Sequence, residues 1–312
     1  MAYARLLRLL VLLLLVAVIA YPFIQGYLEG RSGTGEAMED LPALFQEAIL
    51  HYNVSTRWLL RPEAGVNVSQ HVADALNLSE TLASLASLHP SEEDSSLLSI
   101  TIRASESYSH LANASAMFYE AVELNSLLHR NITYMLRLLG MCRVYEALDI
   151  WASIEDEVYN LTTTLKEGLA ESARATPDNL LSDSHKDVYV EGVERAYKLY
   201  GDLNLLVKLM GIIEEYRDSL VNLCNASTNM NANISGASIP PGLLSGMSSI
   251  KNSLSKIKGG PYSYDLYSTI TSLGGSLSSQ QGAGGMGLGK AVDSPSYSPG
   301  QGAGYGEPPS DD

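Results

Sequence analysis

The sequence predicts an all-α protein: an extended antiparallel helical bundle or array of helical hairpins, behind an N-terminal transmembrane helix and before a disordered C-terminal tail rich in Gly, Ser and Pro. Three observations support this fold class. Apolar residues recur at spacings of three and four through residues 40–224, which is the period of an amphipathic helix. No stretch of convincing length alternates apolar and polar residues, as a half-buried strand does. A single apolar run, within residues 1–28, is long enough to cross a bilayer.

The apolar run predicts an uncleaved signal-anchor that spans the membrane once. Arg5 and Arg8 precede it, and a stretch of about 20 apolar residues crosses the hydrocarbon of a bilayer. Because positive charges stay on the cytoplasmic side, residues 1–8 are expected inside the cell and the chain from Glu29 onward outside. The expected location is therefore the cell membrane, with an extracellular body.

A cleaved secretory signal is the alternative for this segment. Residues 18–20, Val-Ile-Ala, resemble the positions before a signal-peptidase cut. Tyr21, Phe23 and Tyr27 favour the anchor, because they extend the apolar span with aromatic rings of the kind that gather at membrane interfaces. Both interpretations export the rest of the chain, which is a secreted protein if cleavage occurs.

Five amphipathic helices are expected in the extracellular domain, residues 40–224. Each has apolar residues on one face and is bounded by a capping residue, a proline or a glycine. Gly140 and Pro177 are the expected corners, so the helices on either side of each run antiparallel. The expected helices cover residues 40–61, 67–89, 91–140, 142–175 and 184–224.

The third of these helices has apolar residues at multiples of seven, which favours partner helices packed along one stripe. Asn125 and His129 interrupt this stripe. We expect them to form a loose, hydrated layer. The alternative is a buried polar pair that sets the register of the helices.

Cys142 and Cys224 are the only cysteines, and we expect them to form a disulfide. An exported chain folds in an oxidising compartment, where such bonds persist. If the chain reverses at Gly140 and again near Pro177, the fourth helix leads away from one end of the bundle and the fifth returns to it. Two unrelated buried thiols are the alternative.

Eight Asn-X-Ser/Thr sequons follow the apolar segment, on the side expected to be exported. Random placement would give roughly two or three in a chain of this composition, so the excess favours N-glycosylation. Richness in Ser alone is the alternative. The candidate acceptors are Asn53, Asn67, Asn77, Asn113, Asn131, Asn160, Asn225 and Asn233.

The formal net charge of −15 and the pI near 4.8 argue against nucleic acid or an anionic lipid surface as a partner. Both bind proteins through a cationic face that releases counterions. The expected partners are the membrane, through the single N-terminal span, and a protein or a second copy of this chain, through the helices.

No catalytic, cofactor-binding or metal-ligating constellation is found. Gly284–Lys290 matches the pattern G-x-x-x-x-G-K, but Ala291 stands where a phosphate-binding loop needs Ser or Thr. Residues 183–185, Asp-Ser-His, suit a helix cap better than a triad, whose members converge from different elements. Glu106 and His110, one turn apart, are interpreted as a solvated pair on a helix face. We therefore expect no enzymatic activity, no cofactor and no metal ion.

The remaining segments are poorer in apolar residues. Residues 29–39 are expected to be a short linker, and residues 225–278 a Ser/Asn/Gly-rich segment with short helices docked weakly on the body. The apolar spacing within residues 243–257 supports one such helix. Residues 279–312 bury too little surface to offset the entropy of ordering and are expected to be disordered.

The function expected from these features is that of a non-enzymatic, membrane-anchored, glycosylated extracellular helical protein, which acts in protein-protein interaction or in the structure of the cell envelope. The alternative is a ligand-sensing or solute-binding ectodomain that signals through a partner subunit, since helical bundles can enclose small molecules between facing helices.

Overall fold

The computed structural model describes residues 41–62, 67–87, 96–228, 239–257 and 259–281. Within these ranges the regular elements are helices and no strand occurs, which confirms the all-α class. The expected signal-anchor at 1–28 and the linker at 29–39 lie outside the described residues, as does the expected tail beyond residue 281. No helix of the described part is long and apolar enough to cross a membrane.

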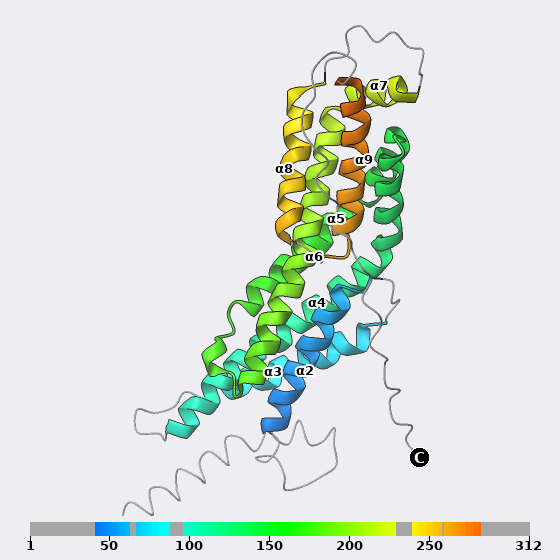
Figure 1. Cartoon of the computed structure of the whole chain (residues 1–312). Coiled ribbons are helices and arrows are strands. Elements are labelled where there is room, and N and C mark those ends of the chain that lie inside the picture. The colour runs from blue at the N-terminus through cyan, green and yellow to red at the C-terminus, as the bar shows by residue number, and fades with distance from the viewer. Residues whose placement is uncertain (1–40, 63–66, 88–95, 229–238, 258, 282–312) are drawn as a thin grey trace, which may run out of the picture.

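Helix α4 (Ser96–Gly140) is the spine of an elongated bundle (Figure 1). Its 45 residues give it a length of roughly 67 Å at 1.5 Å per residue. Helices α5 (Val144–Ser172) and α6 (Asp183–Glu215) follow it, each reversing direction. On α5 the buried residues keep the spacing of three and four that the sequence predicts, and include Trp151, Ile154, Val158, Leu161 and Leu165.

Shorter helices cover the two halves of the spine (Figure 1). Helices α2 (Leu41–Leu59) and α3 (Ser69–Ala86) pack on its N-terminal half, where Ser79 of α3 hydrogen-bonds Ser109. Helix α9 (Ser263–Gln281) packs on its C-terminal half, where the Thr269 hydroxyl donates to the carbonyl of Leu136 at 3.0 Å. Helix α8 (Pro241–Ile257) lies beside α6 and α9.

The α8–α9 hairpin lies mostly within residues 225–278, where the sequence predicts one short helix docked on the body. Helix α8 buries the predicted face. Helix α9 was not expected; it buries Leu266, Ile270 and Leu273, whereas Tyr264 and Tyr267 are exposed. Glycines allow close packing here: a Cβ on Gly246 would lie 2.6 Å from Ile212 of α6. The helical body therefore extends to residue 281. The buried residues of the hairpin are Leu243, Met247, Ile250, Leu254, Tyr262, Leu266, Ile270 and Leu273.

The corners of the bundle agree with the prediction in position and differ in detail. Helix α4 ends at Gly140, but the residue with positive φ is Cys142, at 61°. A short 3-10 turn, Pro177–Asn179, separates α5 from α6. The expected fifth helix, 184–224, is two helices, because the chain leaves helical geometry at Tyr216, and α7 (Arg217–Thr228) follows.

Two glycines of α6 allow a matched test of this packing. A Cβ on Gly192 would lie 2.3 Å from Cε1 of the buried Tyr52, whereas a Cβ on Gly211 would meet nothing within 4 Å. We expect Gly192→Ala to lower the free energy of unfolding by about 1–3 kcal/mol through overpacking. Gly211→Ala should instead raise it by about 0.5–1 kcal/mol through helix propensity. Urea denaturation followed by circular dichroism measures both, and equal effects would contradict the packing of α2 on α6.

Candidate functional site

A buried polar junction lies at the middle of the spine. The Nδ2 of Asn125 donates to the carbonyl of Leu59, at the end of α2, at 3.2 Å. Its Oδ1 accepts from the hydroxyl of Tyr262, just before α9, at 2.6 Å. Both side chains are fully buried, so Asn125 sets the register of α2 and α9 along α4, and the hydrated layer expected there is wrong for this residue. The ring of His129 lies 5.6 Å from that of Tyr262.

Asp202 of α6 is the ionisable group of this junction. Its carboxylate accepts from the backbone N–H of Tyr262 at 2.7 Å and from the hydroxyl of Ser263 at 2.6 Å. Burial raises the pKa of Asp202 to about 6, although these hydrogen bonds act to lower it. The sequence offered no signal for this site, because its partners lie about 60 positions away in a segment expected to dock weakly.

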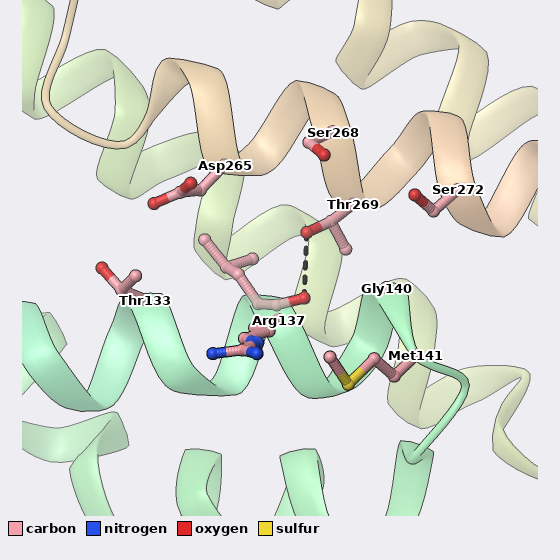
Figure 2. Close-up of a pocket in the computed structure, with 9 residues that line it drawn as sticks. Thr133, Arg137, Gly140, Met141, Asp265, Ser268, Thr269 and Ser272 are labelled. Carbon is pink, nitrogen blue, oxygen red and sulfur yellow. Dashed lines mark hydrogen bonds between the residues drawn. The ribbon is translucent and has the colours of Figure 1, made fainter.

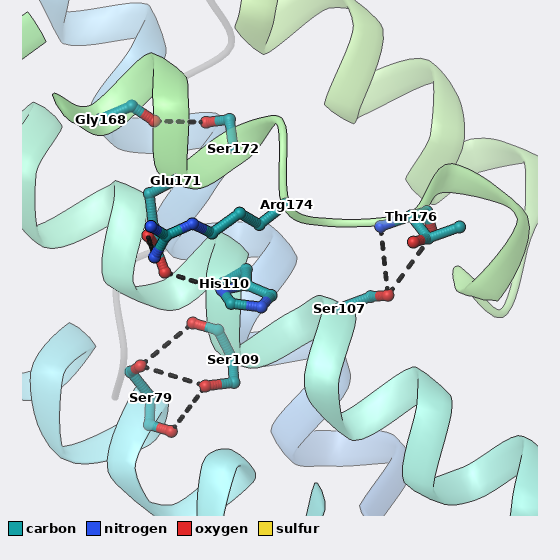
Figure 3. Close-up of polar contacts among 9 residues, drawn as sticks. All are labelled: Ser79, Ser107, Ser109, His110, Gly168, Glu171, Ser172, Arg174 and Thr176. Atoms are coloured by element: carbon teal, nitrogen blue, oxygen red, sulfur yellow. Dashed lines mark hydrogen bonds and ion pairs between the residues drawn. The ribbon is translucent and has the colours of Figure 1, made fainter. Parts of the chain in front are cut away.

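A second polar cluster ties α4 to the end of α5 (Figure 3). The buried carboxylate of Glu171 contacts Nδ1 of His110 at 2.7 Å and Nη1 of Arg174 at 2.8 Å. Burial alone would raise the pKa of Glu171, but hydrogen bonds from His110 and Asn113 outweigh it and hold the pKa below its usual value. His110 therefore pairs across helices rather than with Glu106.

A third cluster gathers aromatic rings between α2, α3 and α4. The ring of His71 stacks on Tyr119 with centroids 5.1 Å apart, and His51 hydrogen-bonds the Tyr119 hydroxyl at 3.2 Å. Trp58 lies 5.3 Å from His71 in an edge-on arrangement. Burial lowers the pKa of His51, so protonation of His51 opposes folding as the pH falls below the ordinary histidine range. We interpret these rings as part of the packed core, because they contact one another directly.

A groove runs between α4 and α9 (Figure 2). Thr133, Arg137 and Met141 line one wall, and Asp265 and Ser272 lie on the other, around a volume of about 310 Å³. A second hollow of about 290 Å³ adjoins it and shares Thr133 and Arg137. The groove opens to solvent along its length.

Exposed apolar residues of α4 continue from this groove along the same helix. Leu127 is 70% exposed, Tyr134 49% and Met141 53%, at successive intervals of seven. Arg130 and Arg137 lie between them, also exposed, and neither forms an ion pair with a described residue. We call Leu127, Arg130, Tyr134, Arg137 and Met141 the α4 stripe.

No group of three His, Cys, Asp or Glu side chains in the described part of the chain is placed to hold a metal ion. The run at residues 183–185 begins α6, where the Ser182 hydroxyl accepts from the backbone N–H of His185 at 3.2 Å, as in a helix cap. The His185 ring contacts Tyr108 and Gln46. Gly284–Lys290 lies outside the described residues.

Comparisons with known proteins give this fold and site no relative: no protein family, no curated protein and no solved structure matches the chain.

The disulfide expected from the sequence is present in the structure. Cys142 and Cys224 are bonded, with their Cα atoms 5.6 Å apart, and the bond closes a chain separation of 82 residues. It joins the turn after α4 to α7, so the reversals at Gly140 and near Pro177 do bring both cysteines to one end.

Removal of this bond should cost stability without changing the fold. A loop of this length corresponds to about 4 kcal/mol in the chain-entropy account. We expect Cys142→Ser/Cys224→Ser to keep the helical circular dichroism spectrum and to unfold with a free energy lower by roughly that amount. Mass spectrometry of non-reduced peptides checks the bond itself, and alkylation of both thiols without prior reduction would disprove it.

The sequons differ in exposure within the described part. Asn67, Asn77, Asn131, Asn160 and Asn225 are exposed, and Asn233 lies outside the described residues. The two others are half-buried and engaged between helices. The Oδ1 of Asn53 accepts from Nη1 of Arg195 at 3.0 Å, and Asn113 hydrogen-bonds Glu171.

Glycan occupancy should follow this difference. If the exported chain is glycosylated after folding, we expect glycans on Asn67, Asn77, Asn160 and Asn225, which are exposed away from the α4 stripe. We expect none on Asn53 or Asn113, because a glycan there would break a contact between helices. Glycopeptide mass spectrometry of protein from its native cells measures occupancy site by site. Full occupancy of Asn113 together with an intact fold would contradict the placement of α4 against α5.

Proposed function

We propose that this chain is a non-enzymatic, membrane-anchored extracellular protein whose helical body binds another envelope protein or a second copy of itself. The first 28 residues would hold it in the membrane with its N-terminus in the cytoplasm, and the exposed sequons that lie away from the α4 stripe would carry glycans. A protein of this kind acts in interaction or in the structure of the cell envelope.

The observation that supports this proposal best is the α4 stripe. Its exposed Leu, Tyr and Met side chains recur every seven residues, which places them on one side of the helix. Its arginines are positively charged, although the chain has a net charge of −15. Tyr and Arg are enriched among the residues that dominate protein-protein binding energy. An acidic or aromatic surface of a partner would complement this stripe, and the adjoining groove would add contact area.

The α4 stripe can be tested on intact cells with a photoreactive phenylalanine analogue in place of Tyr134. We expect cross-links to one partner of defined mass, since the side chain lies within the proposed contact. The same analogue at Tyr197, which is 57% exposed on α6, serves as the matched control and should give few. Equal yields from both positions, or recovery of uncross-linked monomer from both, would contradict the proposal.

The ligand-sensing ectodomain remains the second candidate. It would require a site that encloses a small molecule, whereas the two best-formed hollows of the described residues are the open grooves beside α4. A thermal-shift screen of the helical body against small solutes separates the two functions: reproducible stabilisation by one solute favours sensing.

A further inference from the structure

The α8–α9 hairpin is held to the rest of the body by a small set of polar contacts around a large apolar face. Three of these contacts avoid ionisable carboxylates: Lys208 to Ser249, Thr269 to the Leu136 carbonyl, and Tyr262 to Asn125. The contact at the turn between the two helices is different, because it is made by the buried carboxylate of Asp202.

The turn is shaped around this carboxylate. Oδ2 accepts from the backbone N–H of Tyr262, and Oδ1 accepts from the hydroxyl of Ser263, the first residue of α9. A Cβ on Gly260 would lie 2.2 Å from Oδ2, so the turn approaches Asp202 as closely as a glycine allows. The Ser263 hydroxyl also accepts from the backbone N–H of Gly260 at 3.2 Å, which closes the turn on itself.

No cation neutralises Asp202 in the described part of the chain. On α6 itself, Lys198 pairs with Glu194 and Arg195 pairs with Glu191. On α8, Lys251 lies over the ring of Tyr267, on the outer side of the hairpin, and Lys256 is exposed.

The other helices around the turn place no positively charged side chain within hydrogen-bond distance of Asp202. From α9 the nearest ionisable group in sequence is Asp265, whose pKa is also raised by burial. From α4 it is His129, whose ring lies against Tyr262, and from α2 only the Leu59 carbonyl enters the junction. An ionised Asp202 is therefore stabilised by hydrogen bonds alone, inside a site that has taken it out of water.

The hairpin also lies outside the part of the chain that the disulfide closes. The disulfide closes the chain between Cys142 and Cys224, and α8 and α9 both follow it. Local opening of such a unit needs less free energy than global unfolding, because only the contacts of that unit are broken.

We propose that the α8–α9 hairpin is a pH-controlled detachable unit, locked against α4 and α6 when the buried carboxyl of Asp202 is protonated and released more readily when it is ionised. A protonated Asp202 still accepts from Tyr262 through its carbonyl oxygen and donates to the Ser263 hydroxyl, so the turn keeps its contacts. Release exposes the apolar faces of both helices and the matching surface of α4 and α6.

The direction of the pH dependence follows from the two states of Asp202. Its pKa is about 6 in the docked hairpin against 3.8 for a solvated carboxyl, so the docked state binds the proton more tightly. Docking is therefore strongest below about pH 4, weakens as the pH rises to about 6, and stays at the weaker level above it. The equilibrium for opening should increase by roughly 100-fold between pH 4 and pH 7.

Hydrogen exchange of the full chain, read by mass spectrometry between pH 4.5 and pH 7.5, tests this unit. After correction for the intrinsic pH dependence of amide exchange, we expect peptides from 243–257 and 264–275 to lose protection as the pH rises. Peptides from α5 in the same sample should not follow them. Parallel loss in α5 and the hairpin, or no loss in the hairpin, would overturn the proposal.

Substitutions test whether the carboxyl of Asp202 causes the pH-dependent loss of protection in the hairpin. Asp202→Asn keeps an acceptor for Tyr262 and a donor for Ser263 but does not ionise, so its hairpin protection should not change with pH. Asp149→Asn on the exposed face of α5 removes the same charge elsewhere and should behave as the wild type. Asp265→Asn removes the partly buried carboxyl of α9, separates its contribution from that of Asp202, and should keep most of the response.

If Asp202→Asn does not fold, the pH dependence of hydrogen exchange in the wild type still tests whether the hairpin opens as a separate unit. A wild-type profile retained in a folded Asp202→Asn variant would show that another group controls the opening.

Discussion

The apolar surface of a single 45-residue helix is the constraint on which the rest of the structure depends. Helix α4 has an apolar face along roughly 67 Å, and this face must be covered by other helices. No other helix of the described residues is as long. Burial of the α4 face is therefore shared between two sets of helices. The pair α2 and α3 covers one half and α9 covers the other, while α5 and α6 run beside both. The elongated shape results from this arrangement.

Shared coverage creates a junction, and the junction explains why polar residues are buried there. At the end of α2 a backbone carbonyl has no hydrogen-bond partner within its own helix, and at the start of α9 backbone N–H groups have no such partner. Asn125 donates to that carbonyl, and Asp202 accepts from the N–H group of Tyr262. Buried amides and carboxylates cost free energy unless their hydrogen bonds are satisfied, so these two residues make one alignment of the helices much better than its neighbours. The junction therefore gives the two halves of the bundle a unique register.

The helices with strong periodicity could be predicted from the sequence, because their apolar residues alone determine which face is buried. This holds for α4, for α5 and for the face of α8 at Leu243–Leu254. Helix α9 was missed although Leu266, Ile270 and Leu273 have helical spacing, since Ser and Gly between them lower intrinsic helix propensity and tertiary packing supplies the difference. The break at Tyr216 was missed because apolar spacing continues across it.

The candidate sites could likewise be predicted from the sequence only in part. The pairing of Cys142 with Cys224 was accessible, because two reversals of the chain determine which end each cysteine occupies. The partner of His110 and the role of Asp202 were not, because each depends on how one helix is rotated against another. Exposure of the sequons follows from the same rotations, and spacing along the chain does not reveal it.

The disulfide also determines how the molecule would respond to tension along its chain. Pulling on the C-terminal side can peel away α8 and α9, but the segment between Cys142 and Cys224 cannot extend while the bond is intact. The 82 residues that it encloses would add roughly 280 Å of contour length at about 3.4 Å per residue, and this length stays hidden from any applied force. The bond therefore sets the greatest distance that the helical body can span under load, and its reduction would increase that distance.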